Sequence, residues 1–122
     1  MLNEILYVED EDIAFDVVRR FLVKHSNIYR AVNADSVIEI LGNKKIDIIL
    51  MDISLKHSIN GIDLTRLIRT MPEYIHIPII AVTAHAMAGD KEKILESGCD
   101  AYLSKPFSRQ ELINIINLHS KV

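Results

Sequence analysis

The chain has 122 residues, 49% of them hydrophobic, which is the length and composition of one domain with its own core. Fourteen Lys and Arg residues against 17 Asp and Glu give a net charge of −3, without the basic excess that direct nucleic-acid binding requires. The only cysteine, Cys99, excludes an internal disulfide and a thiolate metal cluster, and it fits a reducing, cytoplasmic compartment. No apolar run approaches the ~18 residues of a membrane span, so we expect no membrane association.

Short apolar runs of strand length alternate with longer segments of helical periodicity along the chain. The predicted strands are 4–9, 28–32, 46–52, 79–83 and 101–105. The predicted helices are at about 12–24, 34–42, 61–70, 89–97 and 108–119. No linker, repeat or low-complexity tract interrupts the alternation, so we expect a single domain over residues 1–122.

Residues typical of helix ends support these boundaries. Gly42 and Gly98 stand where a positive φ angle would end a helix. Ser108 and Glu111 have the spacing of a capping box, and Pro106 lies just before them. The final helix is therefore predicted to start at this point.

Strict alternation of strand and helix predicts the α/β class, with a parallel sheet covered by helices on both faces. The second strand is the least apolar and carries Arg30 in its middle, which suits an edge position. These features favour a flavodoxin-like (βα)5 three-layer sandwich with strand order 2-1-3-4-5.

Polar residues stand where four of the predicted strands end. The first strand ends in Glu9 and Asp10, the third in Asp52, the fourth in Thr83 and the fifth in Lys105. Ligands of open α/β sheets bind outside the carboxyl ends of the strands, so these side chains are predicted to meet at one rim. Taken singly, each has a simpler interpretation as a loop residue, a helix N-terminal charge or a β-branched strand residue. The joint occurrence of complementary groups favours a site.

Clustered carboxylates repel one another unless a cation lies between them. In proteins Mg²⁺ is usually bound by one or two carboxylates and keeps several water ligands. Magnesium prefers phosphate oxygens as its other ligands, and a lysine and a hydroxyl complete the set. The combination points to phosphoryl transfer onto a carboxylate, with Asp52 as the nucleophile.

Five motifs stand in order along the chain: VED at 8–10, MDISL at 51–55, NGIDL at 60–64, AVTAHAMAGD at 81–90 and ESGCDAYLSKPF at 96–107. With these motifs the sequence resembles the receiver domains of two-component response regulators over essentially all 122 residues. The order and spacing of the motifs are specific as a set. The resemblance extends to single-domain receivers and to the receivers of hybrid kinases.

The resemblance implies that Asp52 is the phosphoacceptor. It makes Asp10 and Asp52 carboxylate ligands of magnesium, with Glu9 assisting through a water and the main-chain carbonyl of Ser54 completing the protein ligands. Ser54 and His85 occupy positions that tune phosphoryl loss to water in this family. The stretch from Asp52 to Gly61, which contains LKHSIN, is one residue longer than is usual in the family.

The resemblance also implies a switch. Thr83 hydrogen-bonds the phosphoryl group, Lys105 pairs with its charge, and Tyr102 is the aromatic residue that changes rotamer when the threonine moves. The peptide bond between Lys105 and Pro106 is expected to be cis, as is usual in the family. The surface expected to change is formed by the fourth helix, fifth strand and fifth helix.

The implied phosphoryl donor is a phosphohistidine on a sensor histidine kinase or histidine phosphotransfer protein, and the implied output is a downstream protein partner of unknown identity. A receiver of this kind is not an enzyme acting on an external substrate; only phosphorylation from a donor and autodephosphorylation are expected. Met1 directly before the first strand favours a stand-alone receiver over an excised domain.

Two alternatives remain open from the residues. A phosphatase of the haloacid-dehalogenase type needs a second acid two residues after the nucleophile, and Ser54 occupies that place. A degenerate receiver that acts only as an unphosphorylated interaction module is less consistent with the presence of all five residues Glu9, Asp10, Asp52, Thr83 and Lys105. The five histidines show no metal-ligand spacing, and Cys99 is expected to be a small buried side chain.

Overall fold

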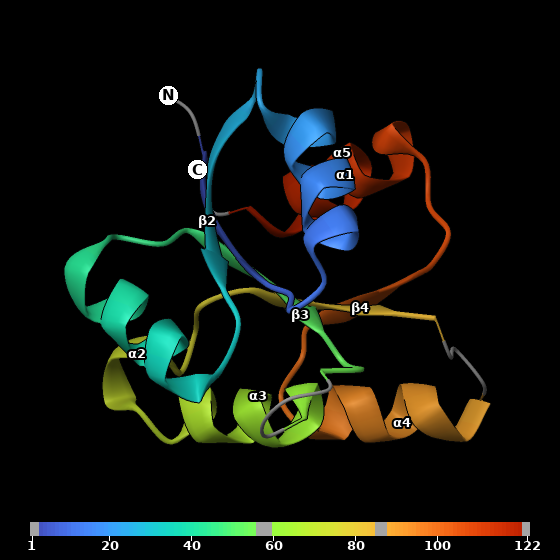
Figure 1. Ribbon diagram of the computed structural model, residues 1–122. Helices are drawn as coiled ribbons and strands as arrows, with labels where there is room; N and C mark the ends of the chain where they lie inside the picture. Colours follow the sequence, from blue (N-terminus) through green and yellow to red (C-terminus); the bar gives the residue numbers. More distant parts are fainter. Residues whose placement is uncertain (1–2, 56–59, 85–87, 121–122) are drawn as a thin grey trace.

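The computed structural model describes residues 3–55, 60–84 and 88–120, and it confirms the predicted alternation of strands and helices (Figure 1). The strands are β1 (Asn3–Val8), β2 (Ser26–Ala31), β3 (Ile48–Asp52), β4 (Ile79–Thr83) and β5 (Ala101–Ser104). The helices are α1 (Asp12–Leu22), α2 (Ala34–Asn43), α3 (Gly61–Arg69), α4 (Ala88–Glu96) and α5 (Arg109–His119). A 3-10 turn, η1 (Pro72–Tyr74), follows α3.

All strand pairs are parallel and the sheet order is β2-β1-β3-β4-β5, as the sequence predicted. The edge position of the strand that carries Arg30 is also confirmed. Figure 1 shows α1 and α5 on one face of the sheet and α2, α3 and α4 on the other. This is the three-layer flavodoxin-like sandwich.

Two hydrophobic clusters fill the space between the sheet and its two helix layers. Ile48 and Leu50 of β3 face the cluster under α1 and α5, whereas Ile49 and Met51 face the cluster under α2, α3 and α4. Every residue of β3 is buried, which explains why its sequence is almost continuously apolar instead of alternating. Each such aliphatic side chain contributes roughly 1.5–3 kcal/mol on burial, so the central strand is held firmly on both faces.

The helix ends match the predictions at two of three places. The capping box joins Ser108 and Glu111, and Gly98 has a φ angle of 116°. The prediction for Gly42 was wrong: the residue lies inside α2 without a positive φ, and the helix ends at Lys44, whose extended backbone donates its N–H to the carbonyl of Ile40. The chain continues directly into an extended segment there, so no left-handed residue is needed.

Several predicted boundaries shift by about two residues. The second strand starts at Ser26 instead of residue 28, and the first helix ends at Leu22 instead of about residue 24. Among the described residues, no helix is both long enough and apolar enough to cross a membrane.

Candidate phosphoacceptor site

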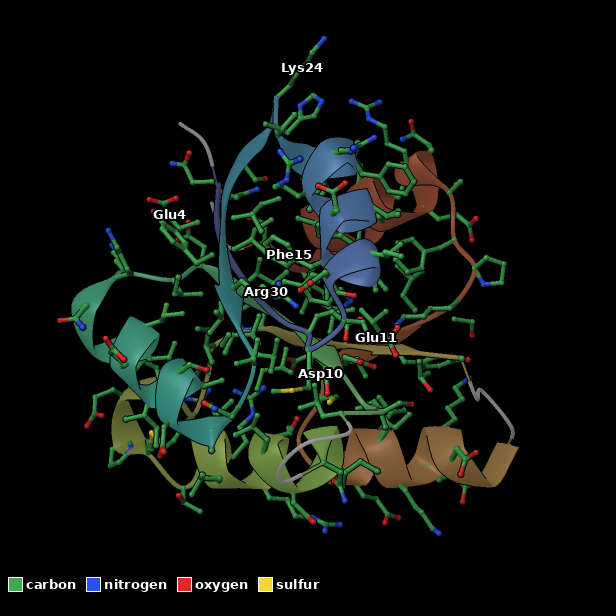
Figure 2. The ribbon with its side chains drawn as sticks, in the orientation of Figure 1. Glu4, Asp10, Glu11, Phe15, Lys24 and Arg30 are labelled. Atoms are coloured by element: carbon green, nitrogen blue, oxygen red, sulfur yellow. The ribbon has the colours of Figure 1, made fainter. Side chains whose placement is uncertain are left out.

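The five polar residues that the sequence placed at strand ends meet at one edge of the sheet. Glu9 and Asp10 directly follow β1, Asp52 and Thr83 are the last residues of β3 and β4, and Lys105 directly follows β5. Figure 2 shows Asp10 in the turn between β1 and α1, beside the carboxyl end of β3. The parallel register brings these strand ends level, which is why residues so far apart in sequence come together.

The carboxylates of Glu9, Asp10 and Asp52 form a compact cluster whose nearest oxygens all lie within 4.8 Å of one another. Glu9 and Asp52 are 0% and 4% exposed, and Asp10 is half-buried. Burial, a hydrogen bond with Asp52 and the negative charge of Asp52 raise the pKa of Glu9 to about 7. The acids therefore crowd one another enough to favour either a shared proton or a bound cation.

Local donors orient these carboxylates. The main-chain N–H of Ser54 donates to Oδ1 of Asp52 at 3.0 Å, and the N–H of Glu11 donates to Oε2 of Glu9 at 3.4 Å. The hydroxyl of Tyr7 donates to Oε1 of Glu9 at 3.3 Å. Burial and the neighbouring carboxylates raise the pKa of that phenol well above its usual range, so it stays a donor at neutral pH.

Lys105 places a cation beside two of the acids. Its Nζ lies 3.3 Å from Oε1 of Glu9 and 3.9 Å from Oδ1 of Asp52, and its side chain is 30% exposed. Its backbone N–H donates to the carbonyl of Thr83 at 2.8 Å, which ties the β5 end to the β4 end. The bond to Pro106 is cis, as the resemblance implied. Among the described residues, this ammonium thus lies beside two members of the three-carboxylate cluster.

Three further predicted residues, Ser54, Thr83 and Tyr102, lie on the α4 side. Thr83 is buried and lines a cavity of about 250 Å³ together with Ser54 and Asp90. Tyr102 of β5 is half-buried, and Nζ of Lys91 lies 5.0 Å above its ring. His85 lies outside the described residues, as does most of the lengthened loop after β3.

The sequence did not predict a role in the site for two residues, Tyr7 and Arg30. Arg30 was used only as a sign that its strand lies at the edge of the sheet. Tyr7 lies two residues before Glu9, so strand periodicity puts their side chains on the same face, and this spacing could have identified it. Arg30 reaches the site only through the pairing of β2 with β1, which the local sequence does not reveal.

The cluster suits a hard cation such as Mg²⁺, because its three members all offer carboxylate oxygens as ligands. Within the part of the chain that the structure describes, this is the one group of three or more potential ligand residues found at metal-binding distances. Cys99 is buried as predicted, and burial raises the pKa of its thiol.

Comparison with known proteins agrees with the geometry. Residues 5–117 match the response regulator receiver domain family. The chain is 35% identical over 117 residues to the polar-differentiation response regulator DivK of Brucella anthropi, covering 95% of this chain and 94% of DivK. The receiver domain of the sensor histidine kinase PA1611 from Pseudomonas aeruginosa is 33% identical, with a TM-score of 0.87 and 98% of both chains covered. That crystal structure has a magnesium ion coordinated in its active-site cleft.

The chemotaxis protein CheY4 of Vibrio cholerae shares the fold, with a TM-score of 0.90 over 98% of this chain and 99% of CheY4 at 18% identity. Sequence, fold and an acidic cluster that fits a phosphoacceptor site with magnesium all agree. This chain belongs to the response regulator receiver domain family.

Proposed function

We propose that Asp52 accepts a phosphoryl group from a phosphohistidine on a sensor histidine kinase or histidine phosphotransfer protein. The observation that carries this proposal is the buried Asp52 carboxylate, clustered with Glu9 and Asp10 and 3.9 Å from the ammonium of Lys105. Asp10, Asp52 and the main-chain carbonyl of Ser54 would hold Mg²⁺, with Glu9 assisting through a water.

In the transfer step, a carboxylate oxygen of Asp52 attacks phosphorus. The P–O bond forms as the donor's P–N bond breaks, and the electron pair of that bond stays on the imidazole nitrogen. Bound magnesium supplies positive charge that stabilises the transferring oxygens. The chain's own contribution is positional: the Ser54 N–H fixes one oxygen of Asp52, and Lys105 stands ready to pair with the incoming charge.

The phosphoryl group adds about −1.5 to −2 charge at the sheet edge. Thr83 and Lys105 would contact it, Tyr102 would change rotamer, and the surface formed by α4, β5 and α5 would change for a downstream protein partner. The cavity beside Thr83 supports this assignment, because it provides space for a side chain to move.

Phosphatase activity on an external substrate is not proposed, because the residue two positions after Asp52 is Ser54, whose hydroxyl is no general acid at neutral pH. Apart from donor-dependent phosphorylation, we propose only loss of the phosphoryl group to water, tuned by Ser54 and His85. The single-domain arrangement over residues 1–122 and a cytoplasmic location complete the proposal.

The test is to incubate the protein with a small acyl phosphate and Mg²⁺ and to measure its intact mass beside an Asp52→Asn control. One phosphoryl adduct that is absent from the control supports the proposal. No adduct on either protein would instead favour an unphosphorylated interaction module.

A further inference from the structure

The turn between β1 and α1 carries Glu9 and Asp10, and it is held from the neighbouring edge strand. The N–H of Glu9 donates to the carbonyl of Ala31 at 2.9 Å, and Nε of Arg30 donates to the carbonyl of Glu9 at 2.9 Å. Both backbone groups of Glu9 are thus bonded to consecutive residues of β2. Nη1 of Arg30 also donates to Oδ1 of Asp12 at 2.8 Å, so one guanidinium spans the turn with Asp10 between its two contacts.

The guanidinium itself lies over an aromatic ring. Arg30 and Tyr7 are register partners on β2 and β1, so their side chains leave the same face of the sheet. The guanidinium carbon of Arg30 lies 5.2 Å from the ring centre of Phe15, and that ring stacks on Tyr7 at 5.9 Å. Figure 2 shows Arg30 and Phe15 together beside the turn that carries Asp10. The stack leaves Arg30 little freedom to leave the turn.

Helix α1 has no side-chain cap of its own: its N-cap residue, Glu11, makes no capping hydrogen bond. Arg30 only donates, so it does not bond the free N–H groups at the start of α1; its contacts to the Glu9 carbonyl and to Asp12, the first residue of α1, instead fix the path of the chain into the helix. The shape of the acidic turn therefore depends on a residue of another strand.

We propose that Arg30 is a positioning residue for the divalent cation. By fixing the Glu9 carbonyl and Asp12 at the two ends of the turn, it holds the carboxylates of Glu9 and Asp10 toward Asp52. This inference rests on the magnesium site of the proposed function and adds a residue outside the ligand set.

If Arg30 acted only through its charge, its removal would change the magnesium affinity in the opposite direction from a loss of positioning. A cation close to the site repels Mg²⁺, so removing its charge would tighten magnesium binding. Loss of positioning would weaken it, by about 10–100-fold, as is typical for residues that orient metal ligands. The direction of the change separates the two roles.

The experiment measures the Mg²⁺ dissociation constant by calorimetric titration with magnesium chloride for Arg30→Met, Arg30→Lys and a control, Arg20→Met. Methionine keeps an apolar stem over Phe15 but has no donor, and lysine keeps the charge but lacks the fork that reaches both contacts. We expect weaker binding for both Arg30 variants and no change for the control, since Arg20 is exposed and pairs with Asp16. Unchanged or tighter binding by Arg30→Met would overturn the inference.

Amide NMR spectra of the metal-free variants separate positioning from general damage. Shifts confined to residues 9–12 and their β2 partners support positioning, whereas shifts throughout the sheet would contradict it. Failure of the wild-type protein to bind magnesium would refute the proposed function itself. The other outcome is that the wild type binds Mg²⁺ and is phosphorylated on Asp52, while Arg30→Met binds Mg²⁺ with equal affinity. That result would refute only the role of Arg30.

Discussion

At the scale of single residues, the site is a set of charges that destabilise the fold unless they are compensated. Glu9 and Asp52 are buried within hydrogen-bonding reach of each other, and Lys105 is shared between them. Burying like charges costs free energy, which a bound cation or a proton recovers. The same arrangement that makes a phosphoacceptor therefore leaves a measurable mark on stability.

The free energy of unfolding of the metal-free protein should fall as pH rises from about 4.5 to about 7. Folded Glu9 keeps its proton up to a pKa of about 7, whereas the unfolded chain releases it near 4.5, so raising the pH through this window favours unfolding. Glu9 alone accounts for at most roughly 3 kcal/mol over the window. Denaturant titrations between these pH values measure it.

In the Asp52→Asn variant, the free energy of unfolding should fall less over the same pH window. The substitution removes the negative charge of Asp52, which helps to raise the pKa of Glu9, while the burial of Glu9 remains. Glu39→Gln makes the same carboxylate-to-amide change at an exposed position of α2 and should leave the slope as it is. An equal slope for Asp52→Asn and the wild type would contradict the coupling of the two acids.

The residues of the site could be predicted because each stands at the end of an apolar run, a local signal. Tyr7 was missed because an aromatic residue inside a strand looks like core, and its hydroxyl contact depends on the conformation of Glu9. The role of Arg30 depends on the pairing of β2 with β1, so no pattern in the neighbouring sequence predicts it.

At the scale of elements, the glycines show where local sequence predicts structure and where it does not. Gly98 has the expected positive φ, and a Cβ there would lie 2.8 Å from Cγ of Arg69. Gly42 lies in α2 with open space around it. Each of the two glycines stands near the end of a segment with helical periodicity in the sequence. They differ in the path that the chain takes after the helix.

We therefore expect opposite effects of the same substitution on the free energy of unfolding. Gly98→Ala should destabilise the protein by roughly 1–3 kcal/mol, since alanine is strained at positive φ and its Cβ crowds Arg69. Gly42→Ala should stabilise it by about 0.5–1 kcal/mol, since alanine loses less backbone entropy in a helix. Chemical denaturation of both variants checks the signs; a stabilised Gly98→Ala would contradict the account.

At the scale of the whole molecule, the proposed function requires one phosphoryl group to shift the balance between two conformations. Moving a population from 1:99 to 99:1 takes ~5.5 kcal/mol of preferential stabilisation, more than the ~1.5–3 kcal/mol of one charge-assisted hydrogen bond. Several contacts must act together, and Thr83 and Lys105 come from neighbouring strands joined by a backbone hydrogen bond.

Lys105→Ala should keep the fold and magnesium binding but uncouple phosphorylation from the change at the α4, β5 and α5 surface. NMR spectra of the phosphorylated variant should lack the shifts around Tyr102 that the wild type shows. Lys44→Ala is a matched control, because Lys44 lies over Tyr29, away from the site. If phosphorylated Lys105→Ala showed the same shifts around Tyr102 as the wild type, the proposed role of Lys105 in the switch would be wrong.

If the proposed site holds magnesium, the ion should stabilise the whole domain, because the three acids are brought together only in the folded chain. At a concentration 100 times the dissociation constant, the gain is about 2.7 kcal/mol. Thermal denaturation with and without Mg²⁺ should show a rise of several degrees for the wild type and little for Asp10→Asn. Asp35→Asn, an exposed acid of α2, should behave like the wild type.

The sheet keeps the two hydrophobic clusters apart, one under α1 and α5 and the other under α2, α3 and α4. Their side chains share no packing layer, so substitutions that refit one helix layer to a new partner leave the other layer's packing undisturbed. Over evolutionary time, exposed residues of α4 can therefore change toward different partners while the packing of the turn after β1, which is held from the α1 side, stays as it is. A duplicated copy of such a domain can thus alter the α4 part of its partner-binding surface without repacking the turn that carries Glu9 and Asp10.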